Sequence, residues 1–331
     1  MKVFVAGASG ALGLPLVREL VSRGHNVTGM TRSKVKVALL EQLGAKAVVA
    51  DALDAPSLLR VISQVTPTHI VDLLTAFPDN GPIRPRDMVA TNELRITGTA
   101  NLLQAAIASG VQRIVGESYF AVYGYGDHGD QPLGEDAPLH EQEPIKALKV
   151  SVDAMRSLET QLLEANIQGQ IEAIILRFGS IYGSENPGTK AIFDLLRRHK
   201  MPLVSGANGL TPFLHTMDAA RAIIAALEIG QPGAIYNIAD DTPSSFNQFV
   251  MAAAQAIGAP LPPTYPRWLM RLVAPAAVAT GMSRLPISNT LAKSELAWRP
   301  QFPNYHDGLE QVAQQLRKPE MGERQAFHQA M

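Results

Sequence analysis

Three glycines at three-residue spacing, Gly7, Gly10 and Gly13, constrain this chain more than any other feature. An apolar run over residues 3–5 precedes them, as expected of a buried strand, and an amphipathic stretch over residues 14–20 follows, as expected of a helix. In such a unit the first glycine permits a tight turn, the second lets a pyrophosphate approach the backbone, and the third lets the helix pack on the strand. The N-terminus of the helix then faces the anion. The opening residues therefore predict a dinucleotide cradle, to which we assign Gly7, Ser9, Gly10, Ala11, Leu12 and Gly13.

Strand and helix signals alternate along the first 180 residues. Short apolar strands are expected over residues 26–30, 46–50, 69–73, 111–115 and 171–176, with helices between them. Two of these helices are long, at about residues 86–109 and 146–165. Alternation of this kind predicts an α/β fold of the Rossmann type, with a doubly wound parallel sheet covered on both faces. Ligands of such folds bind beyond the carboxyl ends of the strands.

The regular pattern weakens after about residue 180, where proline and glycine become more frequent. We therefore predict a dinucleotide-binding domain over residues 1–180, to which later segments can return. Residues 181–331 are predicted to form mainly a smaller substrate-binding lobe.

The composition excludes several classes of function. The 331 residues carry 29 Lys plus Arg against 30 Asp plus Glu, so no basic surface for nucleic acid or an anionic membrane is expected. Cysteine is absent, which excludes disulfides, thiolate metal sites and thiol nucleophiles, and no His, Asp and Glu set has the spacing of a metal site. No apolar run reaches the roughly 18 residues that span a bilayer. These features favour a cytoplasmic protein that acts on a small molecule.

The end of the second expected strand indicates which dinucleotide is bound. A carboxylate at this point bonds the adenosine ribose and repels a 2′-phosphate, whereas a basic residue accepts that phosphate. Here Arg32 follows the strand and no carboxylate is present, so NADP is favoured, with NAD as the alternative. Asp51, after the third strand, is placed to meet the adenine amino group or to cap a turn. Ala52 and Leu74 complete the expected lining of the cofactor site.

Several segments together resemble the extended short-chain dehydrogenase/reductase family, which is the family of NAD-dependent epimerases and dehydratases. The resemblance covers nearly the whole chain and rests on soft motifs in family order. They are the Gly7–Gly13 triplet, Asn92 with Gly98 to Leu103, Val122-Tyr123-Gly124, Leu176 to Gly183, Phe213 to Asp218, Tyr236-Asn237-Ile238 and Glu295 to Pro300. The resemblance implies cofactor contacts from Asn92 and Arg177, and a homodimer built through the two long helices.

The chain departs from this family at the catalytic centre. The family carries Tyr-x-x-x-Lys on the helix after strand five, where the lysine lowers the pKa of the tyrosine and the tyrosine passes a proton to the substrate oxygen. Counting back from Arg177 places Ser151 and Met155 at these positions; a second alignment places Ile145 and Lys149 there. Neither alignment recovers the tyrosine. The family's orienting Ser or Thr is replaced by Tyr119, beside Ser118.

We therefore predict a rearranged proton relay built from Tyr119, Ser118 and Ser151. Glu117 at the end of strand five is a further candidate base or a surface carboxylate, and Lys146, Lys149, Tyr125 and His215 are weaker candidates. The resulting hypothesis is an NAD(P)-dependent oxidoreductase, or an epimerase- or dehydratase-like enzyme, acting on a small oxygenated substrate. The alternatives are a non-redox lyase, cyclase or isomerase on the same fold, and a dinucleotide sensor with eroded catalytic residues.

Overall fold

A sheet of seven parallel strands forms the centre of the protein. The computed structural model describes residues 1–78, 85–140, 143, 145–146 and 148–329, apart from the side chains of residues 85 and 318–329. The strand order is β10-β6-β5-β4-β1-β2-β3. The strands are β1 (Lys2–Ala6), β2 (Asn26–Thr31), β3 (Lys46–Val49), β4 (His69–Asp72), β5 (Arg113–Tyr119), β6 (Glu172–Phe178) and β10 (Ile235–Ile238). The predicted Rossmann-type α/β fold is confirmed.

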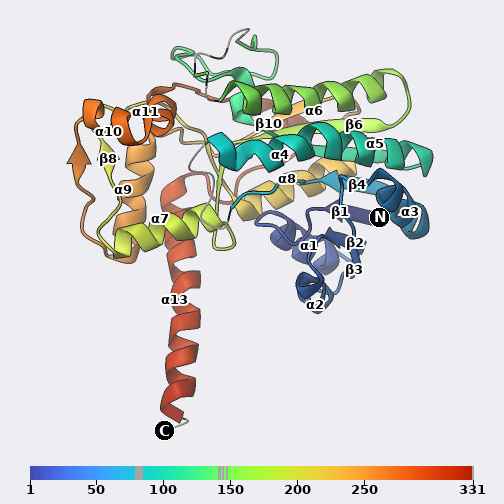
Figure 1. Ribbon diagram of the computed structural model, residues 1–331, viewed down its shortest axis with the longest axis horizontal. Helices are drawn as coiled ribbons and strands as arrows, with labels where there is room; N and C mark the ends of the chain where they lie inside the picture. Colours follow the sequence, from blue (N-terminus) through green and yellow to red (C-terminus); the bar gives the residue numbers. More distant parts are fainter. Residues whose placement is uncertain (79–84, 141–142, 144, 147, 330–331) are drawn as a thin grey trace.

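Each strand contributes alternate side chains to two apolar layers, because successive residues of a strand point to opposite faces. In β1, Val3 and Val5 enter one layer and Phe4 and Ala6 enter the other. The first layer is closed by α1 (Gly13–Ser22), α2 (Val37–Gln42), α8 (Thr216–Ile229) and α12 (Thr290–Glu295), and the second by α3 (Ala55–Val65), α5 (Thr99–Ala108) and α6 (Lys149–Ile167). Figure 1 shows α5 and α6 lying together over one face of the sheet.

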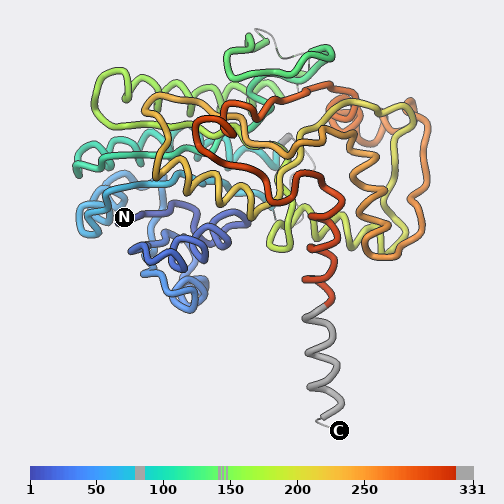
Figure 2. Tube along the Cα trace, turned by 180° about the vertical axis from the view of Figure 1, so that it is seen from behind, coloured from blue at the N-terminus to red at the C-terminus, as the bar shows by residue number. Residues whose placement is uncertain are grey.

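A smaller lobe packs around an aromatic cluster that includes Phe193, Phe213 and Phe249. The rings of Phe213 and Phe249 stack with centroids 4.2 Å apart. The first seventy residues and this lobe lie at opposite ends of the molecule (Figure 2). The remaining elements of this half are β7 (Ser180–Tyr182), α7 (Pro187–Arg197), β8 (Leu203–Val204), β9 (Phe213–His215), α9 (Phe246–Ile257), β11 (Thr264–Tyr265), α10 (Arg267–Val273), α11 (Pro275–Met282) and α13 (Tyr305–Gln329).

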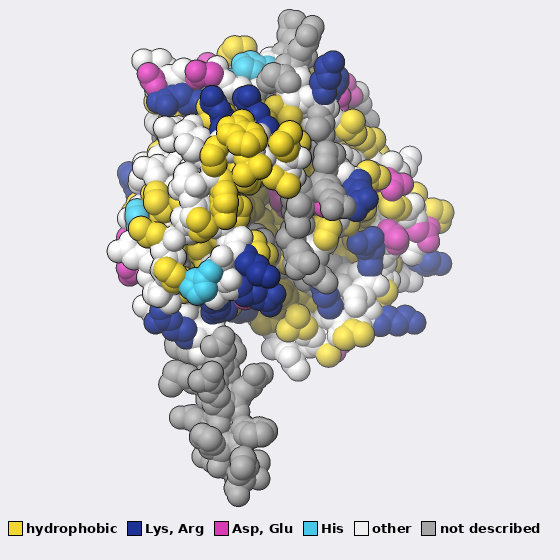
Figure 3. All heavy atoms as spheres, turned by 60° about the vertical axis from the view of Figure 1, so that its left-hand side comes forward, with side chains coloured by type: hydrophobic (Ala, Val, Ile, Leu, Met, Phe, Trp, Pro, Cys, Tyr) yellow, Lys and Arg dark blue, Asp and Glu magenta, His cyan; other side chains and the backbone are white. Residues whose placement is uncertain are grey.

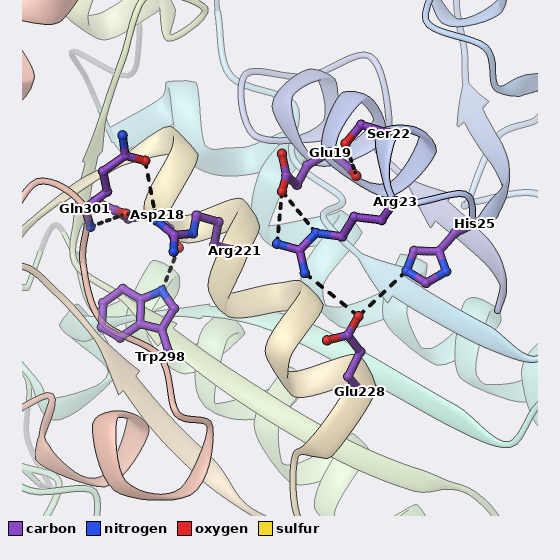
Figure 4. A network of polar contacts seen from close by, with 9 residues as sticks. All are labelled: Glu19, Ser22, Arg23, His25, Asp218, Arg221, Glu228, Trp298 and Gln301. Carbon is purple, nitrogen blue, oxygen red and sulfur yellow. Dashed lines mark hydrogen bonds and ion pairs between the residues drawn. The ribbon is translucent and has the colours of Figure 1, made fainter.

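The C-terminal half also returns to the sheet. Strand β10 pairs with β6, and α8 packs on α1. Figure 4 shows the polar contacts around these helices. Arg23 forms ion pairs with Glu19 at 2.9 Å and with Glu228 of α8 at 3.9 Å. The indole of Trp298 donates to the carbonyl oxygen of Asp218 at 3.0 Å. The domain boundary at residue 180 stays a prediction. It included the possibility that later segments return to the first domain, as β10 and α8 do.

Two elements differ from expectation in ways that matter for the site. Strand β5 extends to Tyr119, four residues beyond the predicted end at 115, because its polar residues find partners in the interior. The helix expected over residues 86–109 is continuous but changes type along its length, from η2 (Pro85–Met88) through α4 (Val89–Glu93) and the π-helical turn η3 (Leu94–Gly98) to α5. Within the described residues, no helix combines the length and apolar character needed to cross a bilayer.

Candidate active site

The glycine turn after β1 has the close geometry that a dinucleotide cradle requires. Gly7 has a φ of 83°, and a Cβ there would lie 2.3 Å from the carbonyl oxygen of Leu73. A Cβ on Gly13 would lie 2.4 Å from the carbonyl oxygen of Gly7, so neither position admits a side chain. The turn is closed by the amide of Gly10, which donates to the carbonyl of Gly7 at 3.0 Å.

The beginning of α1 lies at this turn. Among the described residues no side chain caps this helix at Leu12, although the amide of Leu14 donates to the carbonyl of Gly10 at 3.1 Å. The amides before Leu14 are therefore the ones available to an anion. Ser9 and Ala11 lie in the same turn, and the Ser9 hydroxyl is 2.9 Å from that of Thr31 at the end of β2. The predicted cradle residues therefore come together, and their geometry fits a pyrophosphate.

The adenosine side of the site has an exposed basic edge. Arg32 lies directly after β2, and its side chain is exposed. Asp51 accepts a hydrogen bond from the amide of Leu53 at 3.0 Å, which is the turn role foreseen as one of its two readings. The carbonyl of Ala52 accepts from the Asn101 amide at 2.9 Å, and the amide of Leu74 donates to Asp72 at 3.1 Å. Their contacts with a cofactor stay predictions.

Ser151 and Met155, the positions predicted to replace the family's catalytic pair, are both buried. Ser151 is 8% exposed and Met155 is 3% exposed, and both lie on α6. The Asn92 side-chain amide donates to the Ser151 hydroxyl at 3.2 Å, so one predicted cofactor residue and one predicted catalytic residue touch. The Met155 side chain packs in a cluster with Phe120, and a thioether supplies neither charge nor acidity. A lysine-activated hydroxyl is therefore impossible at this point of the helix.

Ser118 and Arg177 belong to a closed polar network beneath the strand ends. Ser118 donates to the Glu159 carboxylate at 2.6 Å, and Arg177 donates to both oxygens of that carboxylate at 2.9 and 2.8 Å. The Arg177 guanidinium also lies 4.7 Å from the centroid of the Tyr123 ring. The roles predicted for Ser118 in catalysis and for Arg177 at the cofactor stay predictions, and the contacts observed are those of scaffold residues.

Glu117 and Tyr119 lie on the other face of β5 from Ser118, and both keep partial exposure. Burial raises the pKa of Glu117 to about 7, and the positive charge of Arg95 opposes that rise. Burial likewise raises the pKa of Tyr119 to about 12, so its phenol is neutral near pH 7 and donates hydrogen bonds instead of acting as a base. The strand end therefore carries a carboxyl group that titrates near neutrality beside a protonated phenol.

Sequence reasoning missed Arg95, which lies in the π-helical turn η3. The residue is 5% exposed, and Glu117, Tyr119 and Tyr125 interact electrostatically with its guanidinium. The one signal that could have found it is an arginine between Leu94 and Ile96, on a helix otherwise expected to pack on the sheet.

Three of the weaker candidates, His215, Lys146 and Lys149, make contacts typical of structural or surface residues. His215 precedes α8 and its Nδ1 accepts from the amide of Met217 at 3.2 Å, which caps the helix. Lys149 pairs with Asp153 on the same exposed helix face at 2.5 Å, and Lys146 is exposed. Within the part of the chain that the structure describes, no group of three His, Asp or Glu side chains is arranged to hold a metal ion.

Known proteins share this sequence pattern and this fold. A family model described as the NAD dependent epimerase/dehydratase family matches residues 3–239. The chain is 35% identical over 315 residues to a 3-diazoavenalumate denitrifying reductase of a Streptomyces species, covering 93% of this chain and 99% of that protein. It is 25% identical over 317 residues to the UDP-glucose 4-epimerase of Mycolicibacterium smegmatis, covering 91% of this chain and 94% of that one.

Solved structures give the same picture of the fold. The UDP-glucose 4-epimerase of Thermotoga maritima superposes with a TM-score of 0.80 at 19% identity, covering 96% of this chain and 99% of that one. The Thermus thermophilus enzyme of the same name, in complex with NAD, gives 0.79 at 22% identity, with 96% and 99% covered. The curated relatives are named reductases, epimerases and dehydratases, which confirms the expectation of an enzyme. With the family model covering well over half of its length, the chain belongs to the NAD dependent epimerase/dehydratase family.

Proposed function

We propose that this protein is a nicotinamide-dependent reductase whose substrate requires no proton from the enzyme, namely a diazonium compound that loses dinitrogen. The observation that carries the proposal is that no Tyr-x-x-x-Lys pair occurs in the sequence, and that Ser151 and Met155, the residues predicted at its positions, are buried. A carbonyl reductase without the tyrosine lacks the acid that protonates its product. A diazonium reductase needs no such acid and keeps its activity.

The chemistry explains why the relay is dispensable. Reduction of a carbonyl leaves an alkoxide that must be protonated, and the family's tyrosine does this. At a diazonium carbon, a hydride supplies both electrons of the new C–H bond. The C–N bond breaks with its electron pair leaving on dinitrogen, so no oxyanion forms. The bound reduced nicotinamide would supply that hydride and leave as its oxidised form.

The most similar reductase among the relatives above supports this choice by its name. That name states a diazo substrate, a denitrifying reaction and a reduction, and the two chains align over 99% of the relative. Three relatives named as an epimerase or dehydratases share 25–28% identity with this chain. We therefore give more weight to reduction than to epimerisation or dehydration.

The residues that would hold the cofactor are those of the glycine turn and the start of α1. The exposed Arg32, with no carboxylate at the end of β2, supports NADPH over NADH as the form used. Replacing Arg32 by Ala should weaken NADPH binding about tenfold, because a charge-assisted contact to the 2′-phosphate is lost, and should leave NADH binding unchanged. Isothermal titration with the four nicotinamide dinucleotides measures both values.

A second candidate is a reductase of a small oxygenated substrate in which Tyr119 replaces the family's acid. Its neutral phenol at the end of β5 favours this reading. Tyr119→Phe separates the candidates: reduction of a carbonyl should fall by at least 100-fold, since no donor remains, while denitrification should keep its kcat within about threefold. Unchanged carbonyl turnover in this variant would remove Tyr119 from the relay.

The direct experiment offers the enzyme benzenediazonium and NADPH deuterated at the transferable position. We expect release of dinitrogen, oxidation of one NADPH per benzene formed, and deuterium in the benzene. A reaction that proceeds at the same rate without enzyme, or benzene without deuterium, would contradict the proposal. A homodimer through the helices of residues 86–109 and 146–165 and a cytoplasmic location stay predictions, the first measurable by sedimentation.

A further inference from the structure

Arg95 is a buried arginine that has no hydrogen-bond or ion-pair partner among the described residues. The residue is 5% exposed, yet its side chain makes no hydrogen bond to any described residue and no described carboxylate oxygen lies within 4.0 Å of its nitrogens. A guanidinium carries five N–H donors and never loses its charge in a protein. None of the Arg95 nitrogens is a fully enclosed unpaired atom, so these donors keep some contact with solvent and are open to a ligand that supplies acceptors.

The groups around this guanidinium leave an opening of suitable charge. Glu117 contributes a carboxyl whose pKa is raised to about 7 by burial, so it neutralises Arg95 only in part near neutrality. Tyr119 and Tyr125 both lie close enough to interact electrostatically with Arg95, and burial keeps both phenols protonated, with the pKa of Tyr119 at about 12. The Tyr119 phenol also has a side-chain hydrogen bond with Ser180. One cation and two neutral phenols therefore lie in the same region.

The backbone that carries Arg95 is of the kind found at binding sites. The turn from Leu94 to Gly98 is π-helical inside an otherwise α-helical stretch, and such turns occur frequently at functional sites. On the other side, the loop that carries Tyr125 is fixed by Glu143, which accepts from the Tyr125 amide at 2.9 Å and from the Ile145 amide at 2.9 Å. The cation and its flanking phenol are thus both held in place.

We propose that Arg95, with the phenols of Tyr119 and Tyr125, binds a carboxylate group of the substrate. A carboxylate offers two coplanar oxygens that match the fork of a guanidinium, and its remaining lone pairs accept from the phenols. The substrates of the proposed reductase would therefore be small organic acids. This substrate class rests on the proposed function. The substrate in the name of the similar reductase, 3-diazoavenalumate, is named as a carboxylate, which agrees with this substrate class.

Binding of benzoate, measured by isothermal titration in the absence of any turnover, tests the inference. Arg95→Gln should raise the Kd of benzoate about 10- to 100-fold, because charge-assisted hydrogen bonds are lost. Arg95→Lys should recover part of the affinity, since it keeps the charge without the fork. The matched control is Arg86→Gln, which removes an exposed arginine nine residues earlier and should leave the Kd unchanged. Benzamide, the neutral analogue, should bind all four proteins equally weakly.

Two results would overturn the inference. One is a benzoate Kd in Arg95→Gln equal to that of the wild type. The other is a tenfold rise in the Kd of NADPH with no change for benzoate, which would assign Arg95 to the phosphates of the cofactor. Circular dichroism and the melting temperature of Arg95→Gln confirm that the variant compared is folded.

Turnover then separates this inference from the proposed function. With both correct, 4-carboxybenzenediazonium should have a KM at least tenfold below that of benzenediazonium, and Arg95→Gln should abolish the difference. If benzoate binding depends on Arg95 but no diazonium is reduced, the proposed function fails and the anion site stands. If both diazonium salts are reduced equally well by wild type and variant, the function stands and the site fails.

Discussion

Two buried arginines in this protein have opposite surroundings. Arg177, 3% exposed, gives both Nε–H and Nη2–H to the Glu159 carboxylate, a further N–H to the carbonyl of Glu135 at 3.2 Å, and its face to the Tyr123 ring. Arg95, 5% exposed, has partners for none of its N–H groups among the described residues.

The difference separates an arginine of the scaffold from one that is available to a ligand. The buried pair of Arg177 and Glu159 is complete, Ser118 fills one more position on the same carboxylate, and three of the five N–H groups of this arginine are bound within the scaffold. Arg95 has no hydrogen-bond partner among the described residues; burial lowers its pKa, and Glu117 and the nearby phenols oppose that change. Burial alone therefore does not distinguish a scaffold charge from a binding charge; the number of satisfied donors does.

The surface of the smaller lobe differs from both buried sites. Exposed apolar side chains, including Trp268 and Leu272, gather on its face, with Lys and Arg beside them (Figure 3).

The largest expected effect is the loss of Arg177. Arg177→Met should lower the free energy of unfolding by about 3–5 kcal/mol, because it leaves the Glu159 carboxylate buried and unpaired. Urea unfolding followed by circular dichroism measures this value. Adding Glu159→Leu to that variant should restore part of the stability, since the orphaned charge is removed. A loss below about 1 kcal/mol in the single variant would mean that this network is not a scaffold.

Glu117 should give an intermediate effect that depends on pH. Its pKa is raised from 4.5 to about 7 in the fold, so the folded state holds a proton that the unfolded state has released, and stability falls as pH rises from about 4.5 to 7. Arg95 and Asp72 are the charged groups that act on it. Glu117→Gln should leave stability unchanged at pH 4 and increase it by on the order of 1–2 kcal/mol at pH 8. Urea titrations at the two pH values decide this.

The smallest expected effect is on the stability of an Arg95 variant. Arg95→Met should change the free energy of unfolding by no more than about 1 kcal/mol in either direction, because no hydrogen bond is broken and a desolvation cost is removed. The same urea titration as for Arg177→Met makes the two variants directly comparable. Equal losses in both would show that Arg95 also serves the scaffold, and the contrast between the two arginines would disappear.

Most of the fold was predictable because its signals are local. The Gly7–Gly13 spacing, the short apolar strands and the glycines that end helices are each readable within a few residues. The same holds for the cradle, where the lack of room for a Cβ at Gly7 and Gly13 follows from the spacing itself. Strand β5 was predicted too short since its last residues are polar, and polarity normally marks the end of a buried strand.

The catalytic end was predictable in part. Counting along the helix found Ser151 and Met155, and so found that the usual pair is missing. It could not show that Asn92 reaches Ser151 across 59 positions, or that Ser118 is held by Glu159 across 41, because such contacts arise only from tertiary packing. Arg95 was missed for a related reason: a π-helical turn changes which way a side chain faces, and the helical period used in reading a sequence assumes that no such turn occurs.

The π-helical turn also bears on how a site like this one arises. An i to i+5 turn takes up one residue more than an α-helical turn, so the helix on either side keeps its orientation: Thr91 before it and Thr99 after it are both fully buried. The gain of a single codon in this stretch is then enough to bring a new side chain to the strand ends without repacking the core. Removal of one residue between Leu94 and Gly98 should reverse that step and withdraw the guanidinium. In this fold, substrate preference can thus evolve by insertion and deletion inside a helix, a route that comparison of substitutions position by position does not detect.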